Sequence, residues 1–203
     1  MYKFSYYTEE DQAKVIDFMK ENPFALITGI GDNYPVATQI PLTVKLKDGK
    51  IFLEGHMMRK TDHHLSFEKN NNALVIFTGP HCFVNAGWYT DPHMGSTWNY
   101  MTVHAKGKIT FTDEEGTRNA VKALSDKYAG TTSQSAFDNL PAAYINHMVK
   151  AIVGFSIEVE EFDNVFKLSQ NRDEVSQRNI IERLRKRGDA NSAAIANEME
   201  KRL

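Results

Sequence analysis

The pattern of apolar and polar residues predicts closely spaced strands in the first half of the chain. Three β segments follow one another, an apolar one at 24–30, a β-rich one at 35–46 and a third at 50–56. Asp48-Gly49, between the last two, is a strong signal for a tight hairpin turn. Strands so close in sequence pair antiparallel, because a parallel crossover needs a dozen or more intervening residues.

The rest of the chain alternates further strands with helices. The expected strands lie at 73–89, 100–111 and 151–162, and the expected helices at 9–21, 63–70, 175–187 and 193–203. Thr112 and Glu115 have the spacing of a capping box, and Pro141 fits the first turn of another helix. About six linked strands with surrounding helices predict a small antiparallel barrel with helical additions, of the mainly-β or α+β class.

The segment 35–46 contains a proline, Pro41, which has no N–H for a strand ladder and therefore favours an edge or a bulge. The exposed backbone of an edge strand, with the side chains of Thr38 and Gln39, could bind the edge of a heterocycle. An edge strand protected from further pairing by its proline explains the same residues equally well.

Composition narrows the classes of function. The chain has 203 residues, 41% hydrophobic and 25% charged, as is ordinary for a globular protein with its own core. A net charge of −2 argues against a general nucleic-acid coat, and a single cysteine excludes an internal disulfide and a cysteine-based zinc cluster. The sequence shows no apolar run of membrane-spanning length and no signal-peptide core, so we expect a cytoplasmic protein without a membrane contact.

Arg59-Lys60-Thr61 lies directly after a predicted strand and at the start of a predicted helix. An arginine fork, a lysine charge, a hydroxyl group and free helix N–H groups together suit a phosphate dianion. Arg-Lys pairs are common, however, and an ordinary solvated loop would look the same.

The run 78–107 holds both tryptophans, three histidines and the only cysteine. Crowded aromatic side chains with polar tips suit a planar ligand or a subunit interface. The histidines His56, His81 and His104 lack the short spacing of common metal sites, so buried, hydrogen-bonded histidines are the better interpretation and no metal site is expected.

Four segments carry a resemblance to a known family. In order, GPHCFVNAGWY, STWNYMTVHAKG, IVGFSIEV and KLSQNR resemble the PaiB-type FMN-binding negative transcriptional regulators. The similarity covers nearly the whole chain, from PVATQIPL to the C-terminal helices. It implies an antiparallel six-stranded FMN-binding split barrel of the pyridoxamine-phosphate-oxidase-like class. It also implies a homodimer with FMN at the subunit interface. The expected domains are the barrel, 1–165, and a helical extension, 166–203.

The resemblance also implies residue roles. Arg59 and Lys60 would bind the FMN phosphate, and the strand residues near Ile40 would border the isoalloxazine. The full set of expected cofactor-binding residues is Thr38, Gln39, Ile40, His56, Arg59, Lys60, Thr61, Trp98, Asn99, Gln170 and Arg172. One departure is that the family usually has an Asn-Pro-x-Trp element after Gly-His. Here Gly55-His56 leads to the Arg-Lys pair, which looks more like the oxidase branch.

Two functions stay open. A regulator would contact DNA, and helix residues 178–187 carry five basic residues against one acidic residue, a local charge of +4. The solvated face of an amphipathic helix explains this charge at least as well. The alternative is an FMN-dependent oxidoreductase acting on a small substrate, with His56 or His104 as proton donor. The sequence assigns no catalytic residue, because the split-barrel fold by itself does not settle activity.

Overall fold

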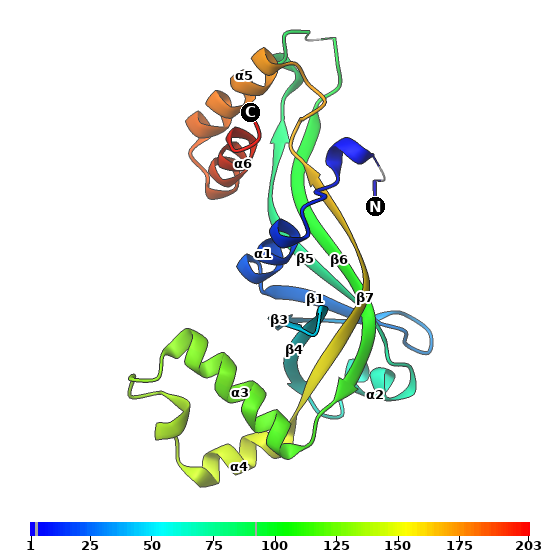
Figure 1. The fold of residues 1–203 in the computed structure, drawn as a ribbon, viewed down its shortest axis with the longest axis vertical. Helices are drawn as coiled ribbons and strands as arrows, with labels where there is room; N and C mark the ends of the chain where they lie inside the picture. Colours follow the sequence, from blue (N-terminus) through cyan, green and yellow to red (C-terminus); the bar gives the residue numbers. More distant parts are fainter. Residues whose placement is uncertain (3, 92) are drawn as a thin grey trace. The chain divides into compact units, whose positions relative to one another are not determined.

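The computed structural model describes residues 1–2, 4–91 and 93–203. Its strands are β1 (Phe24–Gly29), β2 (Val36–Pro41), β3 (Thr43–Lys47), β4 (Lys50–Met58), β5 (Asn72–Val84), β6 (Thr97–Phe111) and β7 (Ile152–Lys167). Its α-helices are α1 (Gln12–Glu21), α2 (Asp62–Lys69), α3 (Glu114–Ala129), α4 (Ala142–Ala151), α5 (Glu174–Arg187) and α6 (Ala190–Glu200). Short 3₁₀ helices span Ser5–Tyr7, Ala86–Trp88 and Phe137–Asn139. The described strands form one sheet in the order β2-β1-β5-β6-β7-β4-β3. All of them except β2 are labelled in Figure 1.

The sheet has seven strands within the described residues, so the prediction of six is wrong. The difference lies in the segment 35–46, which was expected to be one strand and forms two, β2 and β3. Between them, the Leu42 N–H donates to the Pro23 carbonyl at 2.8 Å. The chain then changes partner, because β2 pairs antiparallel with β1 and β3 pairs antiparallel with β4. The position of Pro41 in an edge strand is confirmed.

Turns and caps follow the sequence in most places. Asp48 and Gly49 have φ of 50° and 75°, which confirms the tight hairpin between β3 and β4. Gly188 has φ of 80° and ends α5 in the left-handed conformation. The capping box at Thr112 is wrong, because the carboxylate of the next residue, Asp113, accepts the Gly116 N–H at 2.8 Å and caps α3 instead.

The chain divides into two compact units. Unit 1 contains residues 1–18, 78–103 and 163–203, and unit 2 contains residues 19–77 and 104–162. The three long strands β5, β6 and β7 contribute residues to both units. The domain boundary expected after residue 165 stays a prediction, and each unit is described by itself below.

The core of unit 2 lies on the apolar face of its strands, and the largest fully buried side chains include Ile27, Leu53, Phe155 and Ile157. Along β4, buried positions alternate with partly exposed ones. Because successive strand residues point to opposite faces, His56 lies on the less buried face.

The core of unit 1 includes the contact between α5 and α6, which lie side by side in Figure 1. Ile180, Leu184, Ile195 and Met199 are at most 1% exposed. The Asp189 carboxylate accepts the Ser192 N–H at 2.9 Å and so starts α6 directly after α5 ends. None of the helices formed by the described residues combines the length and apolar character needed to cross a bilayer.

We predict that Gly107→Ala destabilises the protein. A Cβ at Gly107 in β6 would lie 2.0 Å from the Glu158 carbonyl oxygen, a backbone atom that cannot move without disturbing β7. The expected loss is about 2 kcal/mol or more of the free energy of unfolding, measured by urea denaturation. Gly95→Ala is the matched control, because a Cβ there meets nothing within 4 Å. Equal unfolding midpoints for the two variants would contradict the prediction.

Candidate functional site

The junction between β4 and α2, in unit 2, holds Arg59, Lys60 and Thr61. The Arg59 backbone N–H donates to the Ala151 carbonyl at 2.9 Å, and its side-chain Nε donates to the Ile152 carbonyl at 2.8 Å. These two bonds fix the start of the guanidinium group and leave its terminal nitrogens for other partners. Lys60 has φ of 62°, a left-handed conformation that is uncommon outside glycine and often accompanies functional turns.

Thr61 caps α2. Its hydroxyl accepts the His64 N–H at 3.4 Å, lies 3.0 Å from the Met58 carbonyl, to which it donates, and lies 3.0 Å from His63 Nε2. The Asp62 carboxylate also lies at this helix start, where the His63 backbone N–H lowers the pKa of the carboxyl group. Since a carboxylate already uses one helix N–H group, the attraction for an anion comes mainly from the two cationic side chains.

Arg59 and Lys60 have no carboxylate within ion-pair distance among the described residues. Some other cations of unit 2 are paired with a carboxylate, as Lys45 is with Glu54 at 2.6 Å. His64, three residues after Thr61, is 5% exposed, and its Nδ1 has no hydrogen-bond partner in the part of the chain that the structure describes. A buried polar atom without a partner is an exception in proteins. Two uncompensated cations beside a helix start are chemically suited to a phosphate dianion.

The expected isoalloxazine residues lie in β2 of the same unit, and α2 packs against this strand. Gln39 is exposed, Thr38 is partly exposed and Ile40 is buried. A Cβ at Gly55 would lie 3.4 Å from the Ile40 side chain, so β2 and β4 approach each other closely there. The structure therefore brings the seven predicted residues of unit 2 into neighbouring elements.

His56 completes this set. It pairs with Gly154 across β4 and β7, and burial lowers the pKa of its imidazole below the ordinary value of 6.5. Desolvation disfavours the charged form, so the neutral ring is the stable form near neutral pH.

The other four predicted residues lie in unit 1. The Trp98 ring is 52% exposed, with the His81 ring 5.8 Å away between centroids. Asn99, by contrast, is fully buried, where its Oδ1 accepts the Ser169 hydroxyl at 3.0 Å and its amide donates to the Met199 sulfur at 3.5 Å. The Trp98 indole is therefore open to a ligand, whereas the Asn99 amide already forms hydrogen bonds inside the unit.

Gln170 and Arg172 lie in the turn between β7 and α5. Gln170 Oε1 accepts the Leu168 N–H at 2.7 Å and its amide donates to the Phe166 carbonyl at 2.5 Å, so this side chain closes the turn. The Arg172 guanidinium lies 4.5 Å from the centroid of the Tyr89 ring and has no carboxylate partner among the described residues.

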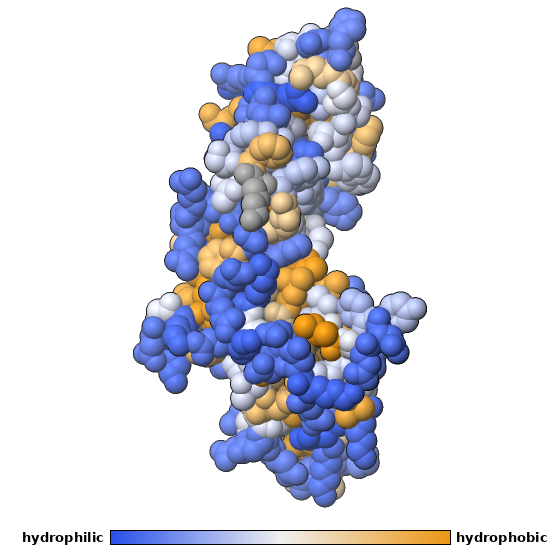
Figure 2. Space-filling view, turned by 90° about the vertical axis from the view of Figure 1, so that its right-hand side faces the viewer, coloured by the Kyte–Doolittle hydropathy of each residue, from blue (hydrophilic) through white to orange (hydrophobic). Residues whose placement is uncertain are grey.

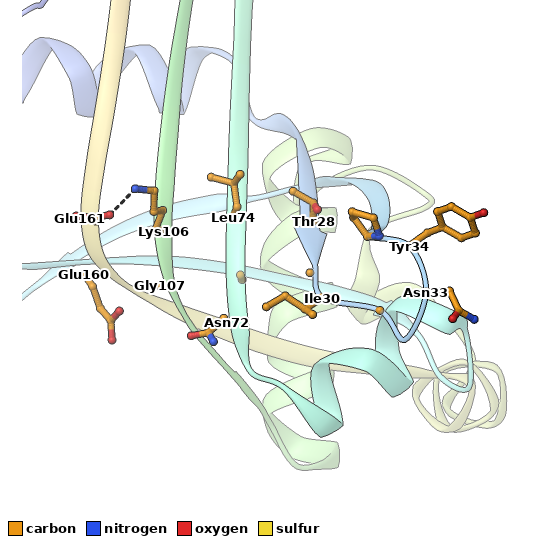
Figure 3. A pocket seen from close by; sticks show the side chains of 14 residues that line it. Thr28, Ile30, Asn33, Tyr34, Asn72, Leu74, Lys106, Gly107, Glu160 and Glu161 are labelled. Carbon is orange, nitrogen blue, oxygen red and sulfur yellow. Dashed lines mark hydrogen bonds and ion pairs between the residues drawn. The ribbon is translucent and has the colours of Figure 1, made fainter. Parts of the chain in front are cut away.

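A cavity of about 700 Å³ in unit 2 was not expected from the sequence. Figure 3 shows Ile30 and Leu74 on its wall and the ion pair of Lys106 with Glu161, whose side-chain atoms are 2.5 Å apart. Its described lining includes none of the predicted cofactor residues and neither Trp98 nor His104. The sequence carries no signal for it, because the lining residues come from four segments far apart in the chain. Among the described residues, no group of three or more histidine, cysteine or acidic side chains could hold a metal ion.

Comparison with known proteins shows the family. The model of the family described as "Putative FMN-binding domain" matches residues 1–161, and the chain belongs to this family. The chain is 30% identical over 204 residues to the protease synthase and sporulation protein PAI 2 of Bacillus subtilis, and the match covers 100% of this chain and 98% of that one. The resemblance to the PaiB-type proteins is thereby confirmed.

Solved structures show the fold. The FAD and heme binding protein of Mycobacterium smegmatis matches with a TM-score of 0.63 at 15% identity, over 83% of this chain and 76% of that one. The flavocytochrome Anf3 of Azotobacter vinelandii matches with a TM-score of 0.64 at 13% identity, over 82% of this chain and 72% of that one. The split-barrel fold is confirmed, with seven strands, and the family confirms FMN as the cofactor.

We predict that His56 makes the protein less stable in mild acid. Because its pKa is lowered in the folded state, the unfolded chain takes up the proton first as the pH falls. Stability should therefore decrease as the pH falls from about 6.5 towards the folded pKa, and level off below it. His56→Gln should flatten this part of the profile in urea unfolding between pH 7.5 and 5. His147→Gln, which removes an exposed histidine, is the control and should keep the wild-type slope.

Proposed function

We propose that this chain acts as an FMN-binding split-barrel homodimer in the cytoplasm, with the flavin phosphate bound at the β4–α2 junction. The observation that carries the proposal is the pair of uncompensated cations, Arg59 and Lys60, beside the capped start of α2. When bound, FMN supplies redox chemistry, and the protein supplies binding, orientation and electrostatics.

Each residue is assigned a role from those of its polar or charged groups that are not used in contacts among the described residues. Arg59 would donate its terminal N–H groups to the phosphate, Lys60 would add a charge, and Thr61 would hold the helix start in place. Thr38 and Gln39 would border the flavin ring along the open edge of β2, with Ile40 supporting them from the core.

The four predicted residues of unit 1 form two groups, according to whether their side chains are available to a ligand. Trp98 and Arg172 have an exposed ring and an uncompensated charge to offer to the cofactor. Asn99 and Gln170 would act as positioning residues, since their polar atoms already bond within the unit.

A homodimer would cover apolar groups that are open to solvent in the single chain. On the face drawn in Figure 2, apolar residues interrupt a mainly hydrophilic surface. The exposed large apolar side chains include Phe24, Ile30, Met58 and Trp98, each more than half exposed. Aromatic residues and methionine are enriched where protein surfaces meet, which supports an interface between copies.

We expect Arg59→Ala to weaken FMN binding at least tenfold, because hydrogen bonds from a charged donor to a phosphate contribute about 1.5–3 kcal/mol. The measurement is fluorescence titration of the flavin-free protein with FMN, with native mass spectrometry to count chains and flavins in the complex. Arg118→Ala, which removes a partly exposed arginine of unit 2 that bonds to Asn146, is the matched control. Unchanged affinity in the Arg59 variant would overturn the phosphate assignment, and a flavin-loaded monomer would overturn the dimer.

The regulator role comes from the resemblance to PaiB-type proteins and from the full-length match to PAI 2, whose name refers to protease synthesis and sporulation. The contacts of the basic helix α5 limit which of its cations could bind DNA. Four of its five cations are engaged within the chain: Arg178 with Glu174, Arg185 with Glu200, Lys186 with Glu182, and Arg187 with the Phe83 carbonyl and the Trp88 ring. Arg183 has no such partner among the described residues.

DNA binding would therefore centre on Arg183, with the exposed ion pairs opening at little cost, since such pairs contribute about 0–1 kcal/mol. We predict that Arg183→Ala lowers DNA affinity and reduces the slope of log affinity against log salt by about one for each phosphate that the helix no longer neutralises. Fluorescence anisotropy at several salt concentrations measures both. Arg178→Ala, in which a paired arginine is removed, should have the smaller effect. Wild-type binding that does not weaken as salt rises would exclude phosphate binding by this helix.

A second candidate function, an FMN-dependent oxidoreductase acting on a small substrate, is supported by the cavity lined by Ile30 and Leu74, which has room for a small organic molecule. Here His56 would act as a neutral proton carrier near the flavin. Rapid reduction of the bound flavin by NADH or NADPH would favour this enzyme over the regulator.

A further inference from the structure

Lys167 is the last residue of β7 and lies in an aromatic setting within unit 1. Its Nζ is 5.4 Å from the centroid of the Tyr2 ring and 5.8 Å from that of the Tyr7 ring. It also donates to the Thr97 hydroxyl at 2.6 Å. The lysine is partly buried and its contacts are π faces and one hydroxyl group, so nothing among them neutralises its charge.

Arg172, five residues further along the chain, is a second cation of unit 1. Its guanidinium lies 4.5 Å from the centroid of the Tyr89 ring and donates to the Met94 sulfur at 2.8 Å. The Tyr89 hydroxyl is buried and has no hydrogen-bond partner among the described residues. The arginine, like the lysine, is therefore held by soft, uncharged contacts.

The two cations act on each other. Burial and the positive charge of Arg172 both lower the pKa of Lys167. Neither cation has a carboxylate within ion-pair distance in the part of the chain that the structure describes. Several exposed cations of unit 1 are paired with a carboxylate, as Arg185 is with Glu200. Two like charges, partly withdrawn from water without a counter-charge, cost free energy that a bound anion would recover.

The aromatic groups around this pair extend beyond the side chains that touch it. The rings of Tyr2 and Phe4 stack at 6.0 Å between centroids, and those of Phe4 and Tyr6 stack at 5.3 Å. These three residues are about half exposed, so ring faces remain open next to the cations. Open aromatic faces favour a planar ring in a ligand.

We propose that Lys167, Arg172 and Thr97 form a binding site for a small aromatic carboxylate, whose carboxylate group meets the two cations and the hydroxyl and whose ring stacks on the N-terminal aromatic residues. The site extends the role expected for Arg172 and assigns one to Lys167. It does not rest on the phosphate assignment, because every residue belongs to unit 1 and Arg59 belongs to unit 2.

The test is calorimetric titration of the full chain with benzoate. The wild type should bind benzoate saturably. Lys167→Gln should weaken binding at least tenfold, and Lys167→Arg, which keeps the charge, should recover most of it. Lys186→Gln is the matched control, because it removes an exposed lysine of the same unit that is paired with Glu182. Unfolding midpoints of all variants identify any that fail to fold.

Other ligands and variants separate the contribution of the aromatic ring from that of the two cations. Cyclohexanecarboxylate should bind at least about fivefold more weakly than benzoate, and inorganic phosphate should not compete at equal concentration. Arg59→Ala should lose FMN affinity and keep benzoate affinity, whereas Arg172→Gln should lose benzoate affinity. Equal benzoate binding by wild type, Lys167→Gln and Arg172→Gln would overturn the site, and equal binding of the aromatic and saturated acids would overturn the choice of ligand.

Discussion

The pairing of β4 with β7 is the constraint on which the candidate phosphate site depends. The ladder runs from the pair Phe52–Glu158 to the pair Met58–Ile152. It continues one residue beyond the strand through the Arg59 N–H, and the Arg59 side chain adds a further bond to the carbonyl of Ile152. The left-handed Lys60 and the cap at Thr61 follow at once. The last β4 pairing thus fixes both the direction of the guanidinium and the position where α2 begins.

Local chemistry made several elements predictable from the sequence. Asp48-Gly49 can adopt left-handed backbone angles at little cost, so the hairpin turn appears where the pattern predicts it. Thr61 can accept an N–H from the first turn of a helix, so α2 begins where the sequence places a helix start. The failures arise where two local choices compete. Thr112 and its neighbour Asp113 are both good caps, and the carboxylate is the one that bonds. In 35–46 the β-rich composition hides the break at Leu42, which depends on a hydrogen bond to the distant Pro23.

The pairing of charged side chains could not be predicted from the sequence, for a related reason. The cluster in α5 looks like a basic surface when its residues are counted, but Arg185 is paired with Glu200 fifteen positions away and Arg187 reaches the carbonyl of Phe83. Arg59 and Lys60, which are less conspicuous in a count, have no carboxylate within ion-pair distance among the described residues. A cation that is available to a ligand differs from other cations in having no carboxylate or carbonyl partner within the chain. Whether it has one depends on contacts between segments far apart in the sequence.

The KLSQNR segment shows how a motif can be identified correctly while its members have different tasks. Gln170 was expected at the cofactor, yet its amide bonds to the backbone of Phe166 and Leu168, just before Ser169, which has φ of 62°. Those bonds stabilise a tight turn in which Lys167 and Arg172, five residues apart in sequence, lie close enough for Arg172 to lower the pKa of Lys167. Without the turn, β7 would end with a single lysine among tyrosine rings. With it, the strand ends in two neighbouring cations, and the aromatic N-terminal residues supply their uncharged surroundings.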